Sequence, residues 1–251
     1  MKQKDLPDAN RRRVLAGGAG VAGLGLLGAA PVLAADRVDS WDAETDVLVV
    51  GTGAAASAAA IFAREAGAAV AMVEKADYFG CTTAKSQGGY WIPNNHLMRG
   101  KGLADERAAA LRYMARLSYP DLYNPDDARL GLAPDDHVLI ATFYDHAARV
   151  VERLDSLGAL RSTFFPGGAG YEYMPDYYGA RPENAAPFGR ILSSQLPDGT
   201  AGMGAEIARQ FEAAVRARGI DVGFGQRAVR LVQAAGGAVA GVEVAGAGGK
   251  T

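Results

Sequence analysis

Cysteine and histidine are scarce in this sequence of 251 residues, which contains one cysteine and three histidines. A single cysteine excludes an intramolecular disulfide framework and provides no spacing typical of a metal site. His137 and His146 fall within one predicted helix, where a rotation of 100° per residue places them on nearly opposite faces. We therefore expect no metal site.

The sequence also lacks a strong excess of charge of one sign, with 26 basic and 28 acidic residues. Residues 1–35 contain more basic than acidic side chains, so their removal would leave a more acidic chain. A nucleic-acid partner is therefore not expected. The hydrophobic content of 49% excludes disorder by composition, and the length fits one large or two small domains.

Residues 1–35 have the pattern of a targeting segment. Arg11, Arg12 and Arg13 precede the uncharged, glycine-rich residues 14–35, and NRRRVLAG resembles a twin-arginine export signal. This resemblance predicts a periplasmic protein that is exported after folding by the twin-arginine translocation machinery, with cleavage near Ala35. The alternative is an uncleaved membrane anchor, because residues 14–35 are just long enough to span a bilayer.

The clearest structural pattern lies in residues 46–74, DVLVVGTGAAASAAAIFAREAGAAVAMVE. The apolar run Val47–Val50 predicts a strand buried on both faces, followed by a glycine turn and an alanine-rich helix that extends to about Ala66. Gly67 is placed to end that helix, so that residues 69–73 return as a parallel strand. The stretch therefore predicts a βαβ unit.

This unit matches the requirements of a dinucleotide. The first glycine permits a tight turn, the second permits close approach of the pyrophosphate, and the helix N-terminus offers N–H groups. An acidic residue at the end of the second strand accepts hydrogen bonds from ribose hydroxyls, and its charge disfavours NADP. The alternative is a tight turn without a cofactor. The expected contact residues are Gly51, Gly53, Ala54, Ala55, Ala56 and Glu74.

The segment KADYFGCTTAKSQGGYWIPNN follows directly after the second strand. Together with GTGAAAS it resembles the flavoprotein family of fumarate reductases, succinate dehydrogenases and 3-ketosteroid dehydrogenases. The resemblance implies FAD as the cofactor and an α/β, Rossmann-like FAD-binding domain with an inserted helical and loop section and a β-hairpin. It also implies phosphate and ribityl contacts from the two threonines and flavin-ring contacts from the backbone of the two glycines. The implied cofactor contacts are Lys75, Thr82, Thr83, Ser86, Gly88, Gly89 and, at the edge of the adenine, Ala228.

Two residues depart from the family pattern. Cys81 stands where the family usually has glycine, and Gln87 where it commonly has glycine or alanine. Cys81 is interpreted as a small, half-buried residue in the place of a glycine, the alternative being a redox or flavin-attachment thiol. We assign no chemistry to it.

Two amphipathic helices are predicted next, over residues 105–117 and 134–158, and a Gly-, Pro- and Tyr-rich loop follows them. The motif MPDYYG in this loop resembles a segment of 3-ketosteroid dehydrogenases in which one tyrosine lies over the flavin and supports a second, catalytic tyrosine. Either Tyr177 or Tyr178 could have this role. The alternative is a loop that only covers the edge of the core.

A helix over residues 205–218, a strand over 220–224 and a hairpin of 228–232 with 239–244 complete the pattern. The predicted organisation is a signal segment (1–35), the first part of the FAD-binding domain (36–98), inserted helices and loop (99–200) and the continuation of the FAD-binding domain (201–251). In the family the chain continues with a substrate-capping domain. The catalytic acid or base is therefore expected beyond residue 251, and an exposed sheet edge is expected where pairing would continue.

The resemblance implies hydride transfer between flavin and a C–C bond next to a carbonyl. The substrate is expected to be a ketosteroid-like small molecule, because GGYWIPNN and MPDYYG supply aromatic groups, and an electron acceptor is a second expected partner. Two alternatives remain: a dicarboxylate substrate, as in the fumarate reductases and succinate dehydrogenases, or a flavin-binding module without catalysis of its own.

Overall fold

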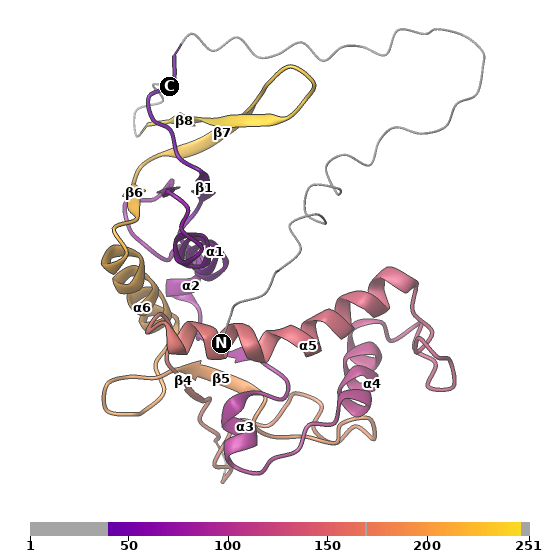
Figure 1. Cartoon of the computed structure of the whole chain (residues 1–251). Helices are drawn as coiled ribbons and strands as arrows, with labels where there is room; N and C mark the ends of the chain where they lie inside the picture. Colours follow the sequence, from indigo (N-terminus) through magenta and orange to yellow (C-terminus); the bar gives the residue numbers. More distant parts are fainter. Residues whose placement is uncertain (1–39, 169, 247–251) are drawn as a thin grey trace, which may run out of the picture.

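The computed structural model describes residues 40–168 and 170–246, so the twin-arginine segment predicted over 1–35 lies outside the described residues. Figure 1 shows the order of the elements, which are β1 (Val47–Val50), α1 (Ala54–Glu65), β2 (Val70–Val73), α2 (Cys81–Lys85), β3 (Tyr90–Trp91), α3 (His96–Gly100), α4 (Arg107–Ser118), α5 (Pro134–Ser156), β4 (Ser162–Phe164), β5 (Ile191–Ser194), α6 (Gly204–Ala217), β6 (Asp221–Gly223), β7 (Arg227–Gln233) and β8 (Val239–Ala245).

The predicted βαβ unit is confirmed. β1 pairs in parallel with β2, with Val47 opposite Val70, and β2 pairs in parallel with β6. Helix α1 ends at Glu65, and Gly67, two residues later, has a φ of 92°, the left-handed conformation expected after a helix. α1 and α6 pack together and share one apolar core with the sheet, in which Ile61 and Val215 are fully buried. The sheet therefore joins segments from both ends of the predicted FAD-binding domain.

The prediction that β1 is buried on both faces is wrong. Val49 is 8% exposed and packs in the core, whereas Leu48 is 36% and Val50 53% exposed. Alternate residues of a strand point to opposite faces, so the described residues cover one face of β1 and leave the other open. A continuous apolar run therefore does not establish two covered faces.

A second layer consists of the antiparallel sheet β3-β5-β4 packed against α5. Both predicted amphipathic helices are confirmed as α4 and α5, but the buried stripe of α5 differs from the expected one. The apolar spacing predicts Ile140, Phe143, Val150 and Leu154 on the inward stripe. Ile140 and Leu154 are buried, but Phe143 and Val150 are 42% and 43% exposed. Between Ile140 and Leu154 the buried side includes Tyr144 and Val151 instead, because it follows the positions of α4 and the second sheet.

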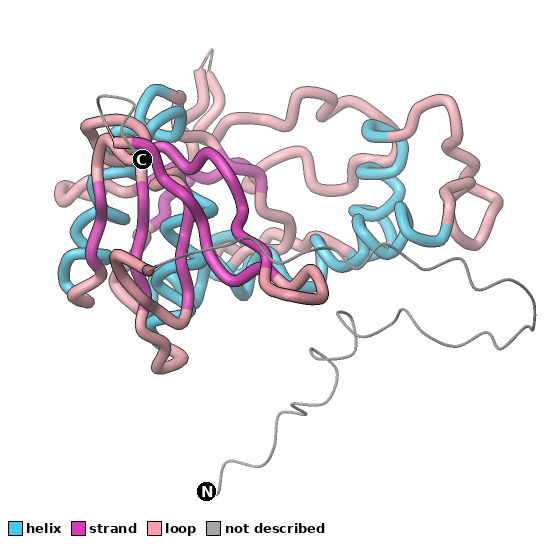
Figure 2. The backbone as a smooth tube through the Cα atoms, turned by 90° about the horizontal axis from the view of Figure 1, so that it is seen from above, coloured by secondary structure: helices cyan, strands magenta, loops and turns pink. Residues whose placement is uncertain are grey.

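The predicted hairpin is confirmed as β7 and β8, in which Ala228 pairs with Val244. Figure 2 shows the strands gathered mostly at one end of the described chain, with the long loops at the other end. Within residues 40–168 and 170–246, no helix combines the length and the apolar character needed to cross a membrane.

Candidate functional site

The glycine turn after β1 places a helix N-terminus at the carboxyl end of the parallel sheet. Gly51 has a φ of 97°, which glycine adopts without steric cost, and its N–H donates to the Val73 carbonyl at 2.7 Å. Gly53 is the residue that precedes α1, and a Cβ added there would lie 3.5 Å from the Thr83 hydroxyl oxygen. The first N–H groups of a helix have no partner within the helix, so this end can bind an anion.

Residues predicted to contact the cofactor meet at this N-terminus. The Ala54 N–H donates to Thr83 Oγ1 at 3.0 Å. This bond joins the first glycine turn to residues 75–89, which are called the second loop below. Ala55 is exposed at the start of α1, and Ala56 packs partly against the apolar core, as expected for a small residue between helix and strand. Thr83 is therefore well placed for a phosphate contact.

Glu74 is buried, at 2% exposure, beneath the same turn. Its Oε2 accepts hydrogen bonds from the N–H and the hydroxyl of Thr52, each at 3.0 Å, and its Oε1 accepts from the Ala76 N–H at 2.8 Å. Burial alone would raise the pKa of Glu74, but the hydrogen bonds from Ala76, Cys81 and Thr52 outweigh it, so the pKa lies below its ordinary value. The carboxylate is thus held as an anion, and its contact with a ribose stays a prediction.

Cys81 has a φ of 44°, in the region that favours glycine, and is half-buried. This confirms the interpretation that it occupies the place of a glycine. Its Sγ lies 3.9 Å from the Thr52 hydroxyl, which also accepts a hydrogen bond from the Gly80 N–H. Burial and the neighbouring Glu74 raise the pKa of the Cys81 thiol, so the thiol stays protonated and is a weak nucleophile.

The second loop packs tightly against the start of α6. Gly88 has a φ of 76°, and a Cβ added to it would lie 2.6 Å from the Gly204 nitrogen. The Gly204 N–H donates to the Ser86 carbonyl at 3.1 Å, and the Gly88 N–H donates to Ser86 Oγ at 3.1 Å. The Gly88 amide thus donates within the loop in this structure, and its contact with the flavin ring stays a prediction.

The remaining predicted contacts are more open. Lys75, Thr82 and Gly89 are exposed. The Gln226 N–H donates to the Glu74 carbonyl at 2.8 Å, so β7 begins beside Glu74 and brings Ala228 to this side of the sheet. Hydrogen bonds thus join the start of α1 to Thr83 and the residue before β7 to Glu74.

A cavity of about 670 Å³ opens next to Gly88 and Gly89. Its walls are mainly apolar and come from the second loop and β3, from α4 and α5, and from the MPDYYG segment. Tyr177 is one of the lining residues and is 92% exposed, whereas Tyr178 is not among them. The Tyr178 ring instead lies 5.6 Å from the Arg181 guanidinium. The structure therefore places Tyr177, and not Tyr178, at the cavity.

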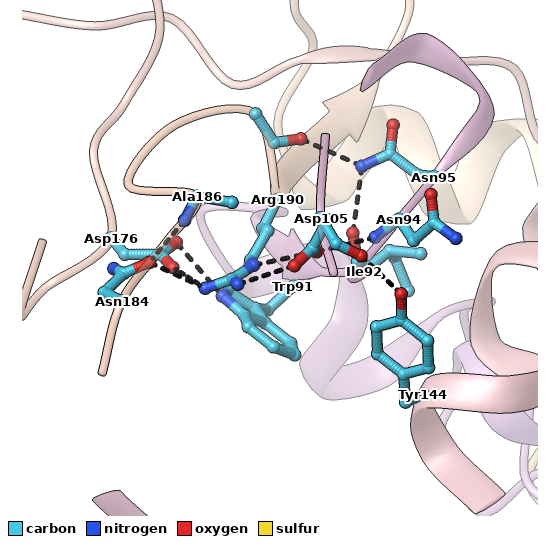
Figure 3. A network of polar contacts seen from close by, with 11 residues as sticks. Trp91, Ile92, Asn94, Asn95, Asp105, Tyr144, Asp176, Asn184, Ala186 and Arg190 are labelled. Carbon is cyan, nitrogen blue, oxygen red and sulfur yellow. Dashed lines mark hydrogen bonds and ion pairs between the residues drawn. The ribbon is translucent and has the colours of Figure 1, made fainter. Parts of the chain in front are cut away.

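Behind the cavity wall lies a buried ionic network that sequence reasoning missed (Figure 3). Arg190 is fully buried and donates two hydrogen bonds to Asp105, at 2.9 and 2.7 Å, and one each to Asp176 and Asn184, at 3.0 Å. Burial raises the pKa of Asp176 even though Arg190 opposes the shift. Because Asp105 is 85 residues from Arg190 and the other partners lie in an irregular loop, no spacing or periodicity marks these residues as partners.

Comparisons with known proteins agree with this geometry. The family model described as "FAD binding domain" matches residues 46–251. The 3-oxosteroid 1-dehydrogenase of Mycobacterium tuberculosis (strain ATCC 25618 / H37Rv) is 33% identical over 141 residues, which cover 55% of this chain and 22% of that protein. The chain thus spans less than a quarter of the length of this curated relative.

Two solved structures resemble the fold. The 3-ketosteroid-Δ4-(5α)-dehydrogenase from Rhodococcus jostii RHA1, in complex with 4-androstene-3,17-dione, has a TM-score of 0.66 at 23% identity, with 86% of this chain and 45% of that chain covered. The open conformation of a flavocytochrome c3 fumarate reductase has a TM-score of 0.57 at 26% identity, with 80% of this chain and 30% of that chain covered. Both likenesses support a Rossmann-like flavoprotein fold.

Proposed function

Because this chain belongs to the FAD binding domain family, we propose that it forms the FAD-binding part of an oxidoreductase that acts on a bulky apolar ketone of the 3-ketosteroid type. FAD, when bound, accepts or donates the hydride. The residues present fit this cofactor, since a glycine precedes the N-terminus of α1 and leaves the space that a pyrophosphate needs. Gly53, Ala55 and Thr83 would hold the phosphates.

The observation that supports the substrate class is the apolar cavity beside Gly89. Trp91, Tyr113, Phe143 and Phe165 supply aromatic surface to its walls. A cavity of this size can enclose a fused-ring molecule and exclude water from it. The wall thus binds the apolar rings of a ketone and orients the C–C bond next to its carbonyl.

We propose that Tyr177 positions the catalytic acid or base at the rim of the cavity. Its phenol extends from the cavity rim, where it can hydrogen-bond a catalytic acid or base supplied by another part of the enzyme. Such a hydrogen bond would lower the cost of ionising that group. Tyr178, which lies outside the wall, has no such role in this proposal.

A dicarboxylate substrate is the second candidate, favoured by the structural likeness to the flavocytochrome c3 fumarate reductase. Recognition of two carboxylates requires cationic side chains. None of the described residues that line the cavity is an arginine or lysine, so the ketone is the better match. The third candidate is a flavin-binding module without catalysis of its own.

For localisation, we propose export to the periplasm by the twin-arginine machinery, with a membrane anchor as the alternative. The sequence of residues 11–13 and the uncharged segment after them support this proposal. An electron acceptor would then reoxidise the flavin outside the cytoplasm.

The full-length gene product, purified with its flavin, provides the test. Addition of a 3-ketosteroid under anaerobic conditions should bleach the flavin absorbance, whereas succinate should not. Bleaching by succinate alone would support the dicarboxylate candidate. No bleaching by either compound would support the module without catalysis.

A further inference from the structure

Arg190 connects parts of the chain that are distant in sequence but share the cavity wall. Its guanidinium bonds Asp105, which precedes α4, and Asp176, which belongs to the MPDYYG segment (Figure 3). Both carboxylates are buried, at 6% and 4% exposure. One side chain therefore ties the base of α4 to the loop that presents Tyr177.

The same guanidinium lies against two aromatic rings of the wall. It is 5.2 Å from the centroid of the Trp91 ring and 5.1 Å from that of the Tyr113 ring. At these distances the cation is attracted to the face of each ring. The Trp91 and Tyr113 rings are themselves stacked, with centroids 6.3 Å apart, and Phe143 stacks on Trp91 at 6.2 Å. Arg190 thus contacts two adjacent members of a row of three rings, the middle one (Trp91) and one end (Tyr113).

A second restraint acts on Trp91. Its indole N–H donates to Asp176 Oδ1 at 3.0 Å, while the other oxygen of the same carboxylate accepts from Arg190. The ring is therefore fixed both through its face and through its edge. Trp91 lines the cavity, so a ring fixed in this way keeps one position in the cavity wall.

The desolvation of its charged groups makes the network a poor source of folding stability. It places one guanidinium and two carboxylates out of water, and buried ion pairs of this kind often contribute no more stability than apolar residues of similar volume. What the network provides is a unique arrangement of the groups it joins. Arg190 itself does not line the cavity, so it can act on a ligand only through the residues that it holds.

We propose that Arg190 is a positioning residue for substrate selectivity: it fixes the Trp91 and Tyr113 rings and the Asp176 carboxylate as one rigid part of the cavity wall that favours a fused-ring ketone over a single-ring ketone. This proposal rests on the proposed function. An extended rigid wall gains contact area from each additional ring of a ligand, whereas a single ring touches only part of it. Mobile rings would lose this advantage, because each would have to be ordered when the ligand binds.

Two variants test the proposal in the full-length flavin enzyme. Arg190→Lys keeps the positive charge but cannot make the two-pronged bond to Asp105 and has no planar guanidinium to lie over the Trp91 and Tyr113 rings. Trp91→Phe keeps a ring but removes the N–H that donates to Asp176. Arg216→Lys, in an exposed pair with Glu212, is the matched control.

KM and kcat are measured for a 3-ketosteroid and for a substituted cyclohexanone. Both test variants should raise KM for the ketosteroid by about tenfold or more and leave KM for the single-ring ketone within about twofold, with kcat little changed. Equal losses for the two ketones, or loss of flavin together with activity, would assign the network a merely structural role and overturn the proposal.

A substrate-independent measurement separates this proposal from the proposed function. These 251 residues contain two tryptophans, so in a full-length background in which Trp41 and every tryptophan outside these residues are replaced by phenylalanine the fluorescence anisotropy decay reports the motion of Trp91 alone. Arg190→Lys should add a fast component to the decay that Arg216→Lys does not add. An unchanged anisotropy decay in Arg190→Lys would overturn the proposal. A parent enzyme that accepts neither ketone would refute the proposed function, and the anisotropy decay would then still show whether Arg190 fixes Trp91.

Discussion

The N–H and the hydroxyl of Thr52 both donate hydrogen bonds to one carboxylate oxygen of Glu74, each at 3.0 Å. The two residues belong to the turn after β1 and to the end of β2, so the bonds join the two parallel strands where the phosphate-binding helix begins. The ionised carboxylate is therefore part of the folded turn, whether or not it also contacts a ribose.

This relationship predicts how stability depends on pH. The folded-state pKa of Glu74 lies below its ordinary value of 4.5, so the ionised group contributes stability above that value and the contribution is lost as pH falls through the folded pKa. Glu74→Gln should lower the free energy of unfolding by roughly 1.5–3 kcal/mol at pH 7. In urea denaturation the difference from the parent should shrink below about pH 4.5, and a constant difference down to pH 3 would contradict the role of the charge.

At the helix N-terminus, Gly53→Val should weaken FAD binding by about tenfold or more, because the added side chain would point toward Thr83 and into the approach of the pyrophosphate. Flavin titration monitored by fluorescence quenching measures the affinity. Gly100→Val is the matched control, since a Cβ at Gly100 meets no atom within 4 Å. Equal FAD affinities of the two variants would show that the pyrophosphate does not bind at this turn.

The contact between the second loop and α6 predicts a loss of stability on adding one methyl group. Gly204→Ala would place Cβ 2.1 Å from the Thr83 carbonyl oxygen, so backbone must move, at a cost of about 1–3 kcal/mol. Gly168→Ala, where a Cβ meets nothing within 4 Å, should change stability little. Thermal unfolding of both variants is the measurement, and an unchanged Tm for Gly204→Ala would show that the loop does not pack on α6 as described.

Tyr177 and Tyr178 are neighbours with different surroundings, which makes each a control for the other. Tyr177→Phe should slow flavin bleaching by a 3-ketosteroid by roughly 10²–10⁴-fold while flavin and substrate still bind, because a phenol supporting the acid or base would be lost. Tyr178→Phe should bleach at nearly the parent rate, since this ring lies outside the cavity wall. If both variants bleach at the parent rate, the loop that carries Tyr177 and Tyr178 only covers the edge of the core.

Replacing Arg11, Arg12 and Arg13 by lysine tests the proposed export route. Lysine keeps the charge, but the twin-arginine pattern is lost, so the full-length protein should accumulate in the cytoplasm. Cell fractionation followed by immunoblotting measures the distribution. Export of the lysine variant at the parent level would refute the twin-arginine proposal.

Much of the fold was predictable because its signals are local. The apolar runs and the glycines after them specify β1, α1 and β2, and the expected hairpin appears as β7 and β8. The exposure of Leu48 and Val50 was not predictable, because an apolar run does not reveal how many faces of its strand are covered. The same limit explains why Phe143 and Val150 of α5 are exposed although their spacing is that of an inward stripe.

The site was predictable where a backbone motif defines it and not where tertiary contacts do. Gly51 and Gly53 form the turn before α1 because that motif has a known geometry, and Thr83 lies against the end of the turn. Arg190 gave no sequence signal, since a buried arginine is recognised only by the acids that fold around it. The use of the Gly88 amide by Ser86 likewise depends on a loop conformation that no periodicity specifies.

The close packing of Gly88 on Gly204 has a consequence for the order in which the enzyme is made. The second loop is synthesised early, but its conformation depends on a helix that leaves the ribosome much later. A nascent chain that ends before α6 therefore lacks one wall of its own cofactor loop. Cofactor capture must wait until α6 has been translated, so on the ribosome it comes late, after the glycine turn and α1 have already emerged.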